Sequence, residues 1–293
     1  MDRMSPLGAV LTFMLFAAAL SSCSDDARGG DDDGGGGDAD TDSDSDSDTS
    51  TDGCSEAAKK IYGIGRNGTL FSFLPPDKKF VAIGKVSCQG AGSPYSMSVA
   101  RDGTAYMLFY DGASTCRGLY KVSTADASCL GKTAFACGDQ GFGLFGMGFA
   151  TDGPDTKAET LFVGKTVAPY RLGSIDLSTF KINPIGNITA APEMTGNGAG
   201  ELWAFFAWVT PPKVAQFDKT TGAESNVVQL SQIPSNGSFA FAFWGGDFYL
   251  FDAPAGDTTV WKLSGGQAGK YMQNTGAEII GAGVSTCAPL VPE

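Results

Sequence analysis

Short apolar runs separated by turn residues make up most of the chain after residue 59. The runs at 61–64, 69–73 and 80–83 are rich in β-branched and aromatic residues, and turn signals at Asn67-Gly68 and 75–77 divide them. Such alternation of apolar runs and turn residues is typical of β-strands. Apolar residues in this region do not recur at the 3.6-residue spacing of an amphipathic helix. The pattern therefore predicts an all-β domain.

A longer pattern repeats through the same region at intervals of 45 to 50 residues. A small-residue strand, an Asp-Gly turn and a second strand follow one another at 96–106 and again at 146–162, and weaker copies start near Glu193 and Ser238. A third and a fourth strand-like run follow in each copy. Four strands in a repeat of this length resemble the blade of a β-propeller.

The two ends of the repeat region supply complementary parts of one blade. Residues 59–85 contain three strands without the small-residue strand, and 279–284 reads Ile-Ile-Gly-Ala-Gly-Val, which is a strand of that kind. The resemblance therefore implies a five-bladed propeller in which the C-terminal strand joins the first blade and removes an open sheet edge. The alternative architecture is a two-sheet β-sandwich.

The first residues of the chain have a different character. An apolar run at 7–20 would span about 21 Å as a helix, which is shorter than the ~30 Å hydrocarbon core and typical of a secretion signal. It ends in Leu20-Ser21-Ser22-Cys23, which resembles the lipobox of bacterial lipoproteins. The resemblance implies that residues 1–22 are removed as a signal peptide and that Cys23 carries fatty acyl chains. Because Ser24 and not Asp follows the cysteine, it also implies an outer-membrane anchor, on the periplasmic face or at the cell surface.

An acidic linker follows the cysteine. Residues 24–53 are almost entirely Asp, Ser, Thr and Gly, so nothing apolar offsets the entropy of ordering them and we expect 23–53 to be disordered. Residues 1–53 hold thirteen Asp and two Arg, which leaves 54–293 nearly neutral within a chain of net charge −12. The domain therefore has no excess of basic residues with which to bind nucleic acid. We also expect the protein to be a monomer. Residues 48–53 imitate the start of a calcium loop, but Lys59 stands where an EF-hand has its bidentate Glu.

Six cysteines remain beside Cys23, and an even number in an exported chain predicts disulfides. Cys54 precedes the first blade and Cys287 follows the closing strand, so a bond between them would lock the ring. Cys116 and Cys129 flank one predicted hairpin, and Cys88 and Cys137 occupy equivalent connections after successive blades, which suggests two further pairs. The chain has no C-x-x-C motif and no histidine, so we expect no metal site.

The absence of histidine also excludes Ser-His-Asp and Cys-His catalysis. The glycines at 141, 143 and 146 match a dinucleotide fingerprint in spacing, but they lead into a strand and not a helix, so no cofactor is expected. A five-bladed glycosidase would need two carboxyl groups on its inner strands, and only Glu193 lies near such a strand. The sequence therefore favours a protein that is not an enzyme.

The leading hypothesis is a membrane-anchored lipoprotein that presents a non-catalytic propeller for binding a protein or a glycan. The alternatives are a structural scaffold of an envelope complex and, less favoured, a five-bladed glycosidase. Aromatic residues in the predicted connections are the candidate ligand contacts, because exposed aromatic rings anchor partners and pack on sugars. These residues are Tyr95, Tyr110, Phe142, Tyr170 and Trp208. The competing interpretation is that they cap the blade edges.

Overall fold

The computed structural model describes residues 54–292 apart from 235 and 236. The predicted signal peptide, Cys23 and the acidic linker lie outside the described residues, as does the partial calcium-loop match at 48–53. Among the described residues, no helix is both long enough and apolar enough to cross a membrane.

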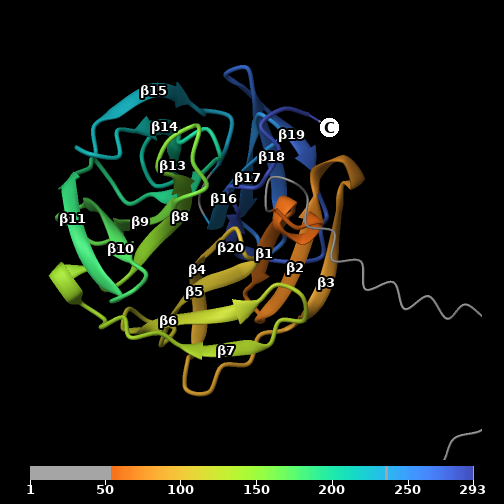
Figure 1. Ribbon diagram of the computed structural model, residues 1–293. Coiled ribbons are helices and arrows are strands. Elements are labelled where there is room, and N and C mark those ends of the chain that lie inside the picture. Colours follow the sequence, from red (N-terminus) through yellow and green to blue (C-terminus); the bar gives the residue numbers. More distant parts are fainter. Residues whose placement is uncertain (1–53, 235–236, 293) are drawn as a thin grey trace, which may run out of the picture. The chain divides into compact units, whose positions relative to one another are not determined.

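Five four-stranded antiparallel sheets are arranged around a central axis, which confirms the five-bladed propeller (Figure 1). The first blade contains, from the axis outward, β20 (Ile279–Val284), β1 (Ile61–Gly65), β2 (Thr69–Leu74) and β3 (Lys79–Lys85). The second contains β4 (Ser93–Val99), β5 (Thr104–Tyr110), β6 (Cys116–Ser123) and β7 (Cys129–Lys132). The third contains β8 (Phe145–Thr151), β9 (Glu159–Lys165), β10 (Arg171–Asp176) and β11 (Lys181–Asn187). The fourth contains β12 (Glu193–Gly196), β13 (Leu202–Phe206), β14 (Lys213–Phe217) and β15 (Glu224–Gln229), and the fifth contains β16 (Ser238–Trp244), β17 (Asp247–Ala253), β18 (Thr259–Ser264) and β19 (Gln267–Met272). Three short 3-10 helices, η1 (Glu56–Lys59), η2 (Pro75–Asp77) and η3 (Asp139–Gly141), complete the regular elements that are described.

The C-terminal strand closes the ring as the sequence predicts. β20 pairs antiparallel with β1, with Ile61 opposite Val284 and Ile64 opposite Gly281. A disulfide between Cys54 and Cys287 lies beside this pairing and joins residues 233 positions apart. The first blade is therefore built from both ends of the domain, and its inner edge is covered.

Small residues let the five inner strands approach one another closely. A Cβ atom on Gly146 would lie 2.2 Å from the Pro192 carbonyl oxygen, and one on Gly283 would lie 2.7 Å from the Ser98 Cα. Hydroxyl groups then satisfy backbone donors of the next blade: Ser98 Oγ accepts from the Phe149 N–H at 3.0 Å. Thr195 Oγ1 accepts from the Phe243 N–H at 3.1 Å in the same way. The Gly, Ser and Thr content of these strands thus follows from their position around the axis.

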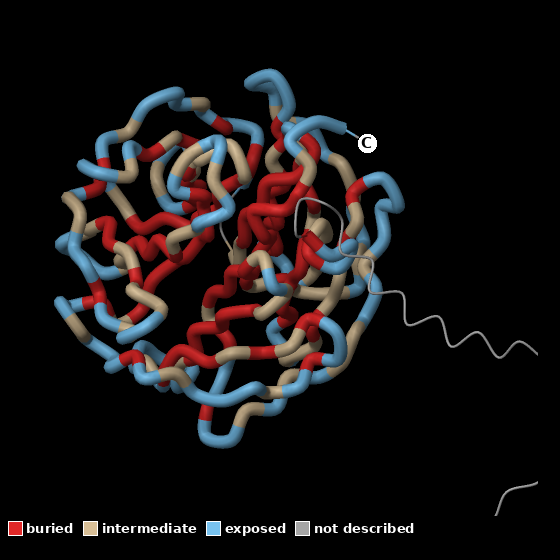
Figure 2. Tube along the Cα trace, viewed as in Figure 1, coloured by how far each residue is buried: buried red, intermediate tan, exposed pale blue. Residues whose placement is uncertain are grey.

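Large apolar side chains fill the space between neighbouring blades. Figure 2 shows buried segments along the inner and middle strands and exposed segments around the outer rim. Phe73, Phe149, Phe205 and Phe251 have no exposed surface, and each belongs to a cluster that joins two blades. Burial of these rings between sheets holds the ring together, since each blade covers the apolar face of the next.

The two remaining disulfide pairs differ from the prediction. Cys88 bonds to Cys129, and Cys116 bonds to Cys137. The register of the second blade explains the error, because Cys129 lies opposite Val122, six residues beyond Cys116, at the other end of the β6–β7 hairpin. The predicted Cys116–Cys129 pair would therefore have to bridge the length of the hairpin. Each cysteine bonds instead to the connection that lies at its own end.

Candidate functional site

The five inner strands run in one direction along the central axis, so the two ends of the propeller are built from different residues. The starts of the strands contribute Pro94, Glu193, Ser238 and Ile280 to one end. The residues that follow the strand ends, Arg101, Gly198 and Thr286, line the other. We name these two ends the strand-start mouth and the strand-end mouth.

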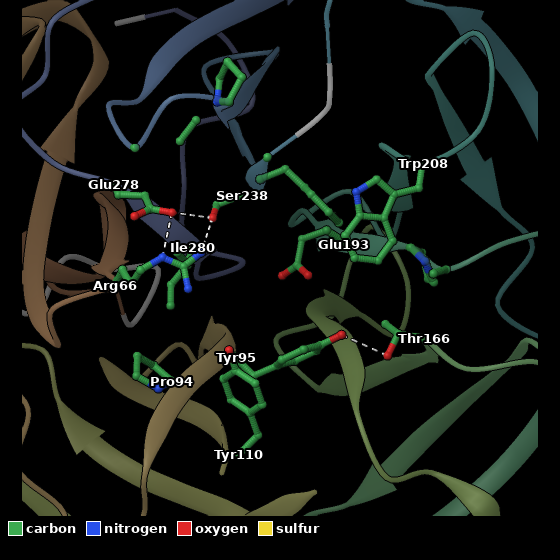
Figure 3. A pocket seen from close by; sticks show the side chains of 17 residues that line it. Arg66, Pro94, Tyr95, Tyr110, Thr166, Glu193, Trp208, Ser238, Glu278 and Ile280 are labelled. Atoms are coloured by element: carbon green, nitrogen blue, oxygen red, sulfur yellow. Dashed lines mark hydrogen bonds and ion pairs between the residues drawn. The ribbon is translucent and has the colours of Figure 1, made fainter. Parts of the chain in front are cut away.

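A cavity of about 360 Å³ occupies the strand-start mouth. This volume lies toward the lower end of the range for small-ligand sites. Its lining combines aromatic side chains with a small set of charged and hydroxyl groups (Figure 3). The lining groups used below are Arg66, Tyr95, Tyr110, Thr166, Glu193, Trp208, Ser238, Phe239 and Glu278.

Aromatic rings form two sides of the cavity. Tyr95 and Tyr110 meet edge to face with 5.3 Å between ring centroids, and the Tyr95 hydroxyl donates to Thr166 Oγ1 at 3.0 Å. Trp208 packs edge-on against Phe239 at 5.1 Å but is 64% exposed. The tyrosines are therefore fixed in place, whereas Trp208 has ring surface that a ligand can cover.

Glu193 is the buried acid of the site. It is the first residue of β12, is 5% exposed, and its carboxyl group points into the cavity in Figure 3. Ser96 Oγ donates a hydrogen bond of 2.7 Å to Glu193 Oε1. Burial raises the pKa of Glu193 well above its ordinary value, and the hydrogen bond from Ser96 only partly opposes this. Burial therefore favours the protonated form of Glu193, which can both donate and accept a hydrogen bond.

A second carboxyl group, Glu278, is held in a polar network on the opposite side of the cavity. Arg66 Nε donates to Glu278 Oε1 at 2.6 Å, and Ser238 Oγ donates to the same oxygen at 2.7 Å. Burial alone would raise the pKa of Glu278, but the hydrogen bonds from Ser238 and Arg66 outweigh it and lower that pKa. Glu278 is thus ionised and neutralises the Arg66 guanidinium.

The strand-end mouth is closed by a different set of contacts. Arg101 Nη1 donates to Thr286 Oγ1 at 3.1 Å, and Thr286 Oγ1 donates to Glu159 Oε2 at 2.8 Å. The Cys54–Cys287 disulfide lies at this end, since both cysteines line the surface hollow beside Arg101. The chain therefore enters the propeller at the mouth opposite the cavity.

The structure brings together three of the five predicted ligand contacts. Tyr95, Tyr110 and Trp208 line the cavity. Phe142 has no exposed surface and packs in the core between the second and third blades, so it cannot contact a ligand. Tyr170 packs against the core between the third and fourth blades and does not line the cavity. Phe142 therefore follows the competing interpretation, in which an aromatic side chain caps a blade edge, whereas Tyr170 is partly buried and lies outside this cavity.

Sequence reasoning missed Arg66 and Glu278. Glu278 directly precedes the closing inner strand, much as Glu193 begins its own inner strand, and this parallel could have identified it. Arg66 lies in the turn between β1 and β2, and only the ring closure brings it beside Glu278. Within residues 54–292, as far as they are described, no cluster of three or more Asp, Glu or Cys residues is suited to hold a metal ion.

No family model matches the chain, and no curated protein matches it either. Solved structures do match, in fold. A chain of the nidogen/laminin complex is 11% identical with a TM-score of 0.49, covering 76% of this chain and 97% of its own. TolB from Acinetobacter baumannii is 13% identical with a TM-score of 0.44, covering 75% and 54% respectively. The PQQ-bound aldose sugar dehydrogenase of Streptomyces coelicolor is 8% identical with a TM-score of 0.43, covering 76% and 81%.

Proposed function

We propose that this protein is an outer-membrane lipoprotein whose propeller binds, without catalysis, a protein or glycan ligand in the cavity at its strand-start mouth. The lipid is carried by Cys23 of the lipobox-like sequence, and the acidic segment that follows is the tether. A cavity of about 360 Å³ admits one small group, such as a sugar unit or a single side chain of a partner.

The observation that carries this proposal is the placement of the cavity relative to the chain entrance. The residue that follows the tether, Cys54, lies at the strand-end mouth and is bonded there to Cys287. Tyr95, Glu193 and Trp208 lie at the strand-start mouth. The point at which the tether joins the propeller and the cavity therefore lie at opposite mouths, so the attachment point does not occupy the cavity.

Binding is favoured over hydrolysis by the state of the two carboxyl groups. A glycosidase needs an ionised carboxylate that is available to water or to the sugar, beside its acid. The ionised partner here, Glu278, is instead engaged by both Arg66 and Ser238. The chain also has no histidine to serve as a general base.

The test uses the full chain expressed in a Gram-negative host. Mass spectrometry of the purified protein is expected to find acyl chains on Cys23, and Cys23→Ala is expected to release the protein from the membrane fraction. Cells that carry the wild-type chain, with the outer membrane intact or permeabilised, are then probed with glycan and peptide arrays. We expect selective binding that is lost in Trp208→Ala and kept in Leu130→Ala, a matched change at an exposed residue of the outer strand β7.

Two results would contradict the proposal. An unacylated Cys23 would contradict the proposed lipid anchor. Array binding that Trp208→Ala does not affect would show that the cavity is not the ligand-binding site. Co-purification of membrane proteins that persists in Trp208→Ala, without any array binding, would instead support the scaffold alternative.

A further inference from the structure

The charges that line the cavity compensate one another. Arg66 and Glu278 form an ion pair at 2.6 Å. Glu193 takes part in no ion pair within the described part of the chain, and its hydrogen-bond partner is the neutral Ser96. With Glu193 in its neutral form, the cavity therefore contains one positive and one negative group that already neutralise each other.

This balance disfavours an ionic ligand. An anion would bring negative charge toward Glu278 and into the region of Glu193 while Arg66 is already paired. A cation would compete with Arg66 for Glu278 or would have to ionise the buried Glu193. Moving a charged group out of water without an available counter-charge is costly, so either ligand binds weakly.

The polar groups also disfavour a purely apolar ligand. The Glu193 carboxyl points into the cavity, and the Arg66 guanidinium, which donates to Glu278 and Ser238, lines it (Figure 3). An inserted aliphatic or aromatic side chain of a partner would strip water from the Glu193 carboxyl and leave its hydroxyl group unsatisfied. A polar group that is buried without a hydrogen-bond partner weakens binding, so a purely apolar ligand is disfavoured.

The ligand class that avoids both disadvantages is an uncharged polyol with one apolar face. Hydroxyl groups both donate and accept, as required beside a carboxylic acid and a guanidinium. The C–H face of a sugar ring packs on an aromatic ring, and Trp208 is the exposed ring at the edge of the cavity. We infer that the cavity binds an uncharged saccharide unit, with its ring against Trp208 and its hydroxyl groups between Glu193 and Arg66. This inference rests on the proposed binding function.

The test measures binding of matched methyl glycosides by saturation-transfer NMR and calorimetry on the purified full chain. The neutral probes are methyl glucoside, galactoside and mannoside. Methyl glucuronide and methyl glucosaminide serve as the anionic and cationic counterparts, and N-acetylphenylalanine amide serves as the apolar side-chain probe. We expect at least one neutral glycoside to bind with a millimolar Kd, and its charged counterparts to bind at least about tenfold more weakly.

Two variants complete the test. Trp208→Ala is expected to weaken binding of the neutral glycoside about tenfold, and Leu130→Ala is expected to leave it unchanged. Retained melting temperatures check that each variant is folded.

The failures of the two proposals are distinguishable. Tighter binding of a charged glycoside or of the phenylalanine amide, lost in Trp208→Ala, would overturn the saccharide inference and leave the binding function standing. Absence of binding by every glycoside up to about 50 mM would also overturn the saccharide inference. Array binding that Trp208→Ala does not affect would overturn both.

Discussion

The Ser96 hydroxyl and the Glu193 carboxyl are joined by a 2.7 Å hydrogen bond across the strand-start mouth, although the residues are 97 positions apart. Ser96 belongs to the second blade and Glu193 to the fourth, and the inner strand of the third blade lies between them. A Cβ atom on Gly146 of that strand would lie 2.9 Å from Glu193 Oε2. Three blades therefore set the position of this one carboxyl group.

Gly146→Ala is expected to destabilise the domain and to displace Glu193. The added Cβ would lie 2.2 Å from the Pro192 carbonyl oxygen, which is backbone and cannot turn aside. Overpacking of this kind costs about 1–3 kcal/mol, measurable by urea unfolding, and saccharide binding should weaken in parallel. Gly143→Ala is the matched control, since a Cβ there meets nothing within 4 Å. Equal stability of the two variants would contradict this account of the close packing between the inner strands.

Glu193→Gln is expected to flatten the dependence of stability on pH. Burial raises the pKa of Glu193 in the folded state, so its contribution to stability is complete below the pKa of the unfolded chain and is lost as pH rises through the folded pKa. As pH rises through the same range, binding of an uncharged saccharide should weaken in the wild type and stay constant in Glu193→Gln. Unfolding and binding measured across a pH series check both expectations.

Glu278→Gln is expected to change the dependence of stability on pH in the opposite direction to Glu193→Gln. The hydrogen bonds from Ser238 and Arg66 lower the pKa of Glu278, so its contribution is present above the ordinary pKa and lost as pH falls. The Glu278 variant should therefore lose stability relative to the wild type at neutral pH and approach it in acid. If stability depended on pH in the same way in both variants, the pKa values of the two carboxyl groups would not be shifted in opposite directions, as the structure indicates.

Asp252→Asn is expected to stabilise the domain at neutral pH. Asp252 is 1% exposed, and neither carboxyl oxygen has a hydrogen-bond partner among the described residues. Burial raises its pKa to about 6, so its contribution to stability is present below about pH 4 and lost as pH rises through about 6. The variant should gain about 1–3 kcal/mol near pH 8 and almost nothing near pH 4 in chemical unfolding.

Asp218→Asn controls for the loss of charge alone. Asp218 is exposed, and hydrogen bonds from Thr220 and Thr221 lower its pKa to about 2. Its replacement should lower stability at neutral pH and have no effect in strong acid, which is the reverse of Asp252→Asn. A gain in stability from both variants would indicate an effect of net charge and not of burial.

The blade repeat could be predicted because its signal is local. Each copy has its own small-residue strand, turn and outer strands, and the copy at 279–284 needed only a partner at the other end of the domain. The cysteine pairs could not be predicted in full, because they depend on which end of a hairpin each cysteine occupies. Cys129 begins β7 but lies opposite Val122, so its partner, Cys88, comes from the connection between the first and second blades.

The candidate site likewise contains some residues that could be predicted from the sequence and others that could not. Tyr95 and Glu193 lie at or near the starts of inner strands, and the repeat allows the starts of these strands to be predicted from the sequence. Arg66 lies in a tight turn that carries no distinctive pattern, and its pairing with Glu278 joins residues 212 positions apart. Phe142 reads as a loop aromatic but is fully buried, because the connection that contains it folds back against the third blade. Contacts made by ring closure and by folded connections leave little trace in local sequence.

The Cys54–Cys287 disulfide is expected to contribute more to stability than the other two. It closes the longest loop, 233 residues, compared with 21 for Cys116–Cys137. On the chain-entropy account, replacement of both cysteines by Ala should cost about 5 kcal/mol for the first pair and about 3 kcal/mol for the second, measured by chemical unfolding.

Hydrogen exchange distinguishes loss of ring closure from general destabilisation. β20 is held in the first blade by its pairing with β1, and Cys287 follows it directly at the strand-end mouth. Loss of the Cys54–Cys287 bond should therefore speed exchange at the amides of β20 and β1 more than at those of β8 and β9, whereas loss of Cys116–Cys137 should not. Uniform acceleration through all five blades in the Cys54–Cys287 variant would contradict a closing role for this disulfide. Preserved protection of β20 would do the same, and would assign ring closure to the β1–β20 hydrogen bonds alone.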